Sequence, residues 1–160
     1  MTTYTELHPD SKVWIYQADR VLNPYEQLSI KQKIDLFTKE WASHGKDVKA
    51  FGDIYYDRFI VLFADETRAG VSGCSIDSSV QFIQSIGREY DINFFNRLQV
   101  AFKDGDEIRS VPQSEFTELC SNGVIHNSTI VFNNLISSKR EFESRWEGPI
   151  SESWHSRFIS

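Results

Sequence analysis

The densest group of side chains able to do chemistry lies at residues 69–79, which read AGVSGCSIDSS. The segment joins two glycines, one thiol, four hydroxyls and one carboxylate, and a helical apolar spacing begins directly after it, at Val80. A helix start presents free backbone N–H groups and the positive end of the helix dipole, and glycine lets a ligand approach the backbone closely. We therefore predict a ligand site here. Its expected ligand-binding residues are Gly73, Cys74, Ser75, Asp77, Ser78 and Ser79.

Helix capping explains part of the same pattern without any ligand. Ser75 or Asp77 would cap the helix, and Cys74 would then be a small buried side chain. Because capping does not explain so many small polar residues together, both interpretations stay open. The negative charge of Asp77 disfavours a phosphate and leaves neutral or weakly anionic ligands. A cysteine phosphatase is excluded, since it needs an arginine that closes the phosphate loop shortly after the cysteine, and this chain has Gln81 in that stretch and no arginine before Arg88.

An enzymatic use of the segment would make Cys74 the nucleophile. The field at a helix start lowers the pKa of a thiol and favours the reactive thiolate, and the neighbouring N–H groups would form the oxyanion site. Such an enzyme also needs a base, for which the chain offers His44, His126 and His155. His44 precedes Gly45 at a predicted helix end, where capping is the simpler role. We take Cys74 and His155 as the candidate catalytic residues.

We expect no metal and no cofactor. The four histidines are scattered and the two cysteines, Cys74 and Cys120, are far apart, so zinc lacks its usual local ligand spacing. Cys120 follows Phe116 at helical spacing, which places it on a packed face. Two isolated cysteines fit neither a disulfide framework nor an oxidising compartment. Residues 104–107 lack the further ligands of a calcium loop and predict a hairpin turn instead.

Composition narrows the class of partner. The 160 residues carry a net charge of -6, and the basic residues are diluted among more numerous acids, so we expect no nucleic acid partner. No apolar run approaches the roughly 20 residues of a membrane-spanning helix, so we expect no direct membrane insertion and a soluble, cytoplasmic protein. The partners that remain are a small molecule, another protein or a second copy in a homodimer.

Apolar periodicity predicts an α+β fold in one domain, residues 1–160. Its first six elements match the ferredoxin-like β-α-β-β-α-β order, and a β-α-β-α extension follows. The expected strands are 12–17, 50–56, 58–64, 98–102, 107–111 and 129–132, and the expected helices are 24–43, 112–123 and 137–146. A further helix is expected after the 69–79 segment, with Val80, Ile83, Ile86 and Tyr90 on one face. In the first helix, the apolar positions Leu28, Ile30, Ile34, Phe37 and Trp41 recur at spacings of two to four. The aromatic tail, 148–160, should dock on the body or on a neighbouring subunit.

Five segments together carry a family resemblance: VWIYQADR at 13–20, WASHG at 41–45, GCSIDSSV at 73–80, TIVFNNL at 129–135 and ESWHSRF at 152–158. They resemble a bacterial family of small proteins, nearly as long as this chain, that is sometimes labelled an ABC transporter ATPase. The resemblance implies no functional residues. The ATPase label would need a P-loop, G-x-x-x-x-G-K-[ST], whereas here Gly45-Lys46 is followed by Asp47 and Glu40 stands in the place of the first glycine.

Three classes of function follow from these residues. The favoured one is a non-enzymatic module that binds a small molecule or a protein at 69–79. The alternative is a cysteine-dependent enzyme, which requires a histidine within hydrogen-bond reach of Cys74. The second alternative is an oligomeric structural or assembly protein, in which Trp154 and its neighbours pack into another subunit.

Overall fold

The computed structural model describes residues 2–43, 48–67 and 76–159 of the chain. These residues form four α-helices and two antiparallel sheets, of three and four strands, so the fold is α+β as predicted. The chain divides into two compact units. The first comprises Met1–Phe95 with Ser137–Arg140, and the second comprises Asn96–Ile136 with Glu141–Ser160. The expectation of a single domain stays a prediction.

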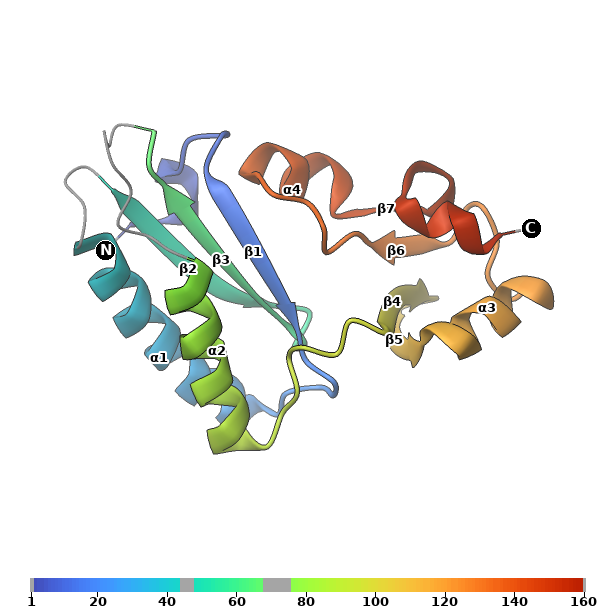
Figure 1. The fold of residues 1–160 in the computed structure, drawn as a ribbon, viewed down its shortest axis with the longest axis horizontal. Coiled ribbons are helices and arrows are strands. Elements are labelled where there is room, and N and C mark those ends of the chain that lie inside the picture. Colours follow the sequence, from blue (N-terminus) through green and yellow to red (C-terminus); the bar gives the residue numbers. More distant parts are fainter. Residues whose placement is uncertain (1, 44–47, 68–75, 160) are drawn as a thin grey trace. The chain divides into compact units, whose positions relative to one another are not determined.

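The first unit holds a three-stranded sheet and two helices (Figure 1). Its strands lie in the order β1-β3-β2, with each neighbouring pair antiparallel. The helix α1 begins after Asn23, whose side chain accepts a hydrogen bond from the Glu26 N–H while the Glu26 carboxylate accepts one from the Asn23 N–H. The elements are β1 (Lys12–Gln17), α1 (Pro24–Ser43), β2 (Lys49–Tyr55), β3 (Phe59–Asp65) and α2 (Ile76–Tyr90).

Both helices share one core with the sheet. Alternate residues of β3, among them Ile60 and Leu62, pack in a single cluster with α1 residues such as Ile34 and with α2 residues such as Ile83 and Ile86. Every residue of β3 is buried, which confirms the expectation from its almost continuous apolar sequence. The middle of α2 is therefore held on the same core as the central strand.

The ferredoxin-like order is not confirmed, because the strand that would complete it pairs elsewhere. Residues 99–104 form β4 (Gln99–Asp104), which joins β5 (Glu107–Pro112) in the second sheet rather than β1 in the first. The physical reason is local. Gly105, with φ of 63°, supports the tight turn between β4 and β5, so the predicted hairpin forms between neighbours in sequence.

The second unit is built around its own sheet, in the order β5-β4-β6-β7. Its further elements are α3 (Gln113–Ser121), β6 (Ile130–Phe132), α4 (Lys139–Arg145, whose first two residues belong to the first unit) and β7 (Glu147–Pro149). Val100, Phe102 and Phe116 lie in its core cluster. The helices predicted at 112–123 and 137–146 are confirmed, each with slightly narrower bounds.

The aromatic tail packs within the second unit. Ile150 is part of the core cluster, and Phe158 packs against it, with its ring centroid 5.5 Å from that of Phe116. Two short 3-10 helices, Ile150–Glu152 and Trp154–Phe158, shape this segment. Contact of the tail with a neighbouring subunit stays a prediction. Among the residues that the structure describes, no helix is both long and apolar enough to cross a membrane.

Candidate functional site

The predicted site lies between the end of β3 and the first turn of α2. Gly73, Cys74 and Ser75 fall outside the described residues. Asp77, Ser78 and Ser79 belong to the first turn of α2, which begins at Ile76. The structure therefore describes Asp65 to Thr67, just before the segment, and Ile76 to Ser79, its last four residues. We call these two stretches the borders of the segment.

Ser79 ties the first turn of α2 to the sheet. Its Oγ lies 2.8 Å from the Ile76 carbonyl oxygen and 2.7 Å from the Tyr16 hydroxyl. Since a serine hydroxyl has one proton and donates it to the carbonyl, the Tyr16 hydroxyl donates to Ser79. Burial raises the pKa of Tyr16, although the Ser79 hydrogen bond opposes this, so the phenol stays protonated and able to donate. With its side chain buried and bonded, Ser79 positions the helix.

Asp77 is the exposed charged group of this turn. Its side chain lies in the first turn of α2, where a carboxylate interacts favourably with the positive end of the helix dipole. Ser78, beside it, is half-buried, and Ile76 is exposed. The turn therefore exposes the Asp77 carboxylate and the Ile76 side chain to solvent. The hydrogen bond between Ser79 and Tyr16 holds the backbone of this turn in place.

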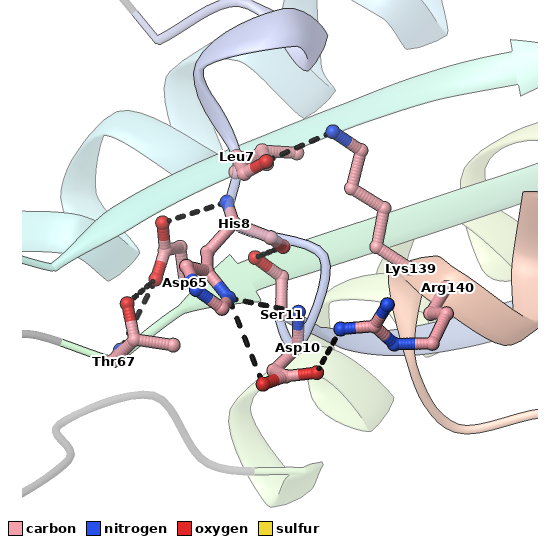
Figure 2. Close-up of polar contacts among 8 residues, drawn as sticks. All are labelled: Leu7, His8, Asp10, Ser11, Asp65, Thr67, Lys139 and Arg140. Atoms are coloured by element: carbon pink, nitrogen blue, oxygen red, sulfur yellow. Dashed lines mark hydrogen bonds and ion pairs between the residues drawn. The ribbon is translucent and has the colours of Figure 1, made fainter.

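The end of β3 is fixed by a network of polar contacts centred on Asp65 (Figure 2). One carboxylate oxygen accepts a hydrogen bond from the His8 N–H at 3.0 Å, and the other accepts from the Thr67 N–H at 3.1 Å and the Thr67 hydroxyl at 2.6 Å. Burial alone would raise the pKa of Asp65, but these hydrogen bonds and the nearby His8 outweigh it and lower that pKa. Asp65 is thus an ionised, fully engaged anchor.

The N-terminal residues are held to the same region by Lys139. This lysine is buried, and its Nζ donates to the carbonyl oxygens of Leu7 at 2.9 Å and Tyr4 at 3.2 Å. The ammonium also lies 4.3 Å from the centroid of the Tyr4 ring. Next to it, Arg140 makes an exposed ion pair with Asp10 at 3.0 Å (Figure 2). Sequence alone gives no signal for this clamp, because lysine at a helix start is ordinarily solvated.

Glu66 is the residue of this region whose hydrogen bonding is incomplete. Its Oε2 lies 3.6 Å from Lys12 Nζ. Its Oε1 is buried, yet it accepts no hydrogen bond within the part of the chain that the structure describes. A buried carboxylate oxygen without a donor is unfavourable by a few kcal/mol. The sequence patterns predict no role for Glu66. The available signal was its place directly after a buried strand, where loops often carry functional polar residues.

The three histidines in the described ranges each use a ring nitrogen for a local contact. Nδ1 of His8 accepts a hydrogen bond from the Asp10 N–H at 3.0 Å, and Nδ1 of His126 accepts one from the Ser128 N–H at 3.2 Å. His44 falls outside those ranges. The predicted base, His155, belongs to the second unit, whereas Asp77 and its neighbours belong to the first.

His155 is built into the core of the second unit. It is 2% exposed, its ring stacks on Trp154 with centroids 3.9 Å apart, and its Nδ1 lies 2.6 Å from the Ser153 Oγ. Burial, helped by the positive charge of Arg157, lowers the pKa of His155 to about 4. An imidazole with so low a pKa is a weak base at neutral pH.

Neither Cys120 nor any group of metal-ligating side chains adds a second candidate site in the described residues. Cys120 is half-buried on α3 and packs against the core of the second unit, as its spacing predicted. Burial raises the pKa of its thiol, which disfavours the thiolate. Within residues 2–43, 48–67 and 76–159, no three side chains of His, Cys, Asp or Glu gather as metal ligands do.

Comparison with protein-family models, with curated proteins and with solved structures gives no match for this chain. The resemblance to the small bacterial family labelled ABC transporter ATPase therefore stays a prediction. The geometry of the described residues carries the functional argument.

Proposed function

We propose that this protein is a non-catalytic binding module whose ligand meets the chain between Glu66 and the first turn of α2. The ligand is a small polar molecule or a segment of a protein partner that carries N–H donors. We place this activity in the cytoplasm. The observation that carries the proposal is the buried Glu66 Oε1, which lacks a donor among the described residues.

The chemistry of Glu66 specifies the kind of group it would take. A carboxylate oxygen is an acceptor only, so its missing partner must be a donor such as an amide, an amine or a guanidinium. Hydrogen bonds to an ionised acceptor are stronger than those between neutral groups. Together with Asp77, Glu66 puts negative charge on both borders of the segment. These charges disfavour the weakly anionic ligands that the sequence left open, and we propose a neutral or cationic ligand instead.

Hydrogen bonds hold both borders of the segment in place, which supports binding there. The Asp65 hydrogen bonds fix the residues before the segment, and the bond between Ser79 and Tyr16 fixes its last residues. Holding ligand-binding groups in place before the ligand arrives lowers the entropy that binding costs. Gly73, Cys74 and Ser75, which lie outside the described residues, stay part of the proposed site.

The rival function, a cysteine enzyme with Cys74 as nucleophile, needs a base of suitable pKa. His155 is buried, bonded to Ser153 and weakly basic, and Nδ1 of His126 is used by its own turn. These contacts favour structural roles for both histidines and so support the binding module over the enzyme.

Matched small probes test the proposal. We would measure the melting temperature with butanamide, n-butylamine, butanoate or inorganic phosphate, at equal pH and ionic strength. A ligand that binds only the folded state raises the melting temperature. We expect a rise with the amide or the amine and none with the two anions.

The variant Glu66→Gln should abolish that rise, while Glu107→Gln, an exposed residue of the β4–β5 hairpin, should keep it. No rise with either donor, or an equal loss in both variants, would contradict the proposed site. A rise that Glu66→Gln leaves unchanged would place binding elsewhere and also contradict it.

A further inference from the structure

The outward side of α1 carries large apolar side chains in solvent. Tyr25 is 87% exposed, Leu28 is 65% exposed and Leu36 is 66% exposed. On a helix with 3.6 residues per turn these positions fall within one stripe, about 80° wide, together with Gln32 and Lys39. The opposite side of α1 packs on the sheet through Ile30 and Ile34. We call the stripe of Tyr25, Leu28, Gln32, Leu36 and Lys39 the outer face of α1.

The outer face is symmetric about its middle residue. Leu28 and Leu36 each lie four positions from Gln32, and Tyr25 and Lys39 each lie seven positions from it. When two copies of a helix pair antiparallel across a twofold axis, a residue before the centre meets the level of the residue equally far after it. Leu28 of one copy would then lie level with Leu36 of the other, and Gln32 with Gln32.

The charges of the helix fit the same arrangement. Lys31 pairs with Asp35 at 2.9 Å, and Lys33 pairs with Glu89 at 3.1 Å, so these flanking charges are balanced inside the chain. Lys39 has no carboxylate within ion-pair distance among the described residues. In the antiparallel pair its ammonium comes level with the exposed ring of Tyr25, and a cation near an aromatic face is attracted to it.

We infer that the outer face of α1 binds a second copy of this chain, as an antiparallel helix pair centred on Gln32. The two leucines supply the apolar contact, and Tyr25 with Lys39 sets the direction and register. One helix face buries less area than the roughly 1,200 to 2,000 Å² of a stable interface. The dimer is therefore weak and depends on protein concentration. This inference is independent of the proposed ligand site.

A single cysteine on the twofold axis tests the register. In a Cys74→Ser, Cys120→Ala background, Gln32→Cys would place two thiols level with each other, and mild oxidation should join the copies by a disulfide. The matched control is Leu135→Cys, also at an exposed position but in the second unit, where leucine is 74% exposed. We expect several times more covalent dimer from Gln32→Cys. Equal cross-linking of the two variants would overturn the inference.

Sedimentation of the full chain tests the apolar contact. The wild-type mass should rise above the monomer value of 18.6 kDa between micromolar and millimolar concentration. Leu36→Glu should remove that rise, because it brings charge into the pair, whereas Leu135→Glu should not. A wild type that stays monomeric over the whole range, or a dimer that persists in Leu36→Glu, would overturn the inference. Both substitutions are at exposed positions, so loss of folding does not confuse the result.

Discussion

At the scale of single residues, the start of α2 depends on one buried hydroxyl. Ser79 connects this turn to β1 through Tyr16 and also bonds the Ile76 carbonyl. Ser85, further along α2, makes the same kind of bond to a carbonyl three residues earlier, but it is exposed. Both serines make the local bond, but only Ser79 also contacts Tyr16. Comparing alanine variants of the two therefore shows how much the contact with Tyr16 adds to the free energy of unfolding.

Replacing Ser79 by alanine should destabilise the protein, because the buried Tyr16 hydroxyl loses its acceptor. We expect the free energy of unfolding in urea to fall by about 1–3 kcal/mol. Ser85→Ala should change it by no more than about 0.5 kcal/mol. Equal losses in the two variants would show that Tyr16 contributes nothing to holding α2.

His155 links stability to pH at the same scale. Its pKa is about 4 in the folded chain and about 6.5 in an unfolded one. Between these values the unfolded chain binds more protons, so the contribution of the neutral imidazole is full above pH 6.5 or so and is lost as the pH falls toward 4. The loss amounts to about 3 kcal/mol at most.

The variant His155→Phe should flatten the dependence of the unfolding free energy on pH in this window. The substitution Leu135→Phe, at an exposed position without a titratable group, should leave the slope as it is in the wild type. The slope, rather than the absolute stability, is the quantity to compare. An unchanged slope in His155→Phe would mean that the folded chain accepts the proton as readily as the unfolded one.

At the scale of elements, the contact between α1 and β2 depends on a glycine. A Cβ atom at Gly52 would lie 2.6 Å from Ile34 Cγ2 and 2.8 Å from Leu62 Cδ2, closer than carbon atoms can approach. Gly52→Ala should therefore push the helix from the strand and lower the free energy of unfolding by about 1–3 kcal/mol. At Gly148 an added Cβ meets nothing within 4 Å, so Gly148→Ala is the matched control. A Gly52→Ala protein as stable as this control would contradict the packing described.

Local patterns predict the elements well and their partners poorly. The strand over Lys12–Gln17, the helix over Pro24–Ser43 and the hairpin around Gly105 all follow from periodicity and turn residues. The pairing of β4 in a second sheet does not, because alternation along a strand says nothing about which strand lies beside it. Leu28 belongs to the apolar repeat that predicts this helix, yet it is exposed, since neighbouring apolar residues on a helix can face opposite sides.

At the candidate site, too, sequence predicts local structure but not the contacts between distant segments. Sequence locates the helix start, because small polar residues precede an apolar helical repeat. It does not distinguish a serine that binds a ligand from one that bonds a buried tyrosine, as Ser79 does. Nor does it show that one oxygen of Glu66 is buried without a donor, which depends on packing between segments distant in sequence.

At the scale of the whole molecule, two compact units each have a core of their own. The first joins three strands to α1 and α2, and the second joins four strands to α3 and the aromatic tail. The proposed ligand site and the outer face of α1 both belong to the first unit, whereas His155 is part of the packing of the second. Binding by the first unit then requires no chemistry from His155. The central claim of the proposed function is that this unit binds its ligand without catalysis by Cys74.

The alkylation rate of Cys74 from pH 5 to 10, in a Cys120→Ala background, tests that claim most directly, because a catalytic cysteine must be a reactive thiolate. A non-catalytic module predicts a rate that rises with a midpoint at or above the ordinary thiol pKa of about 8.5. A fast reaction with a midpoint well below that value would contradict the account and make Cys74 a nucleophile.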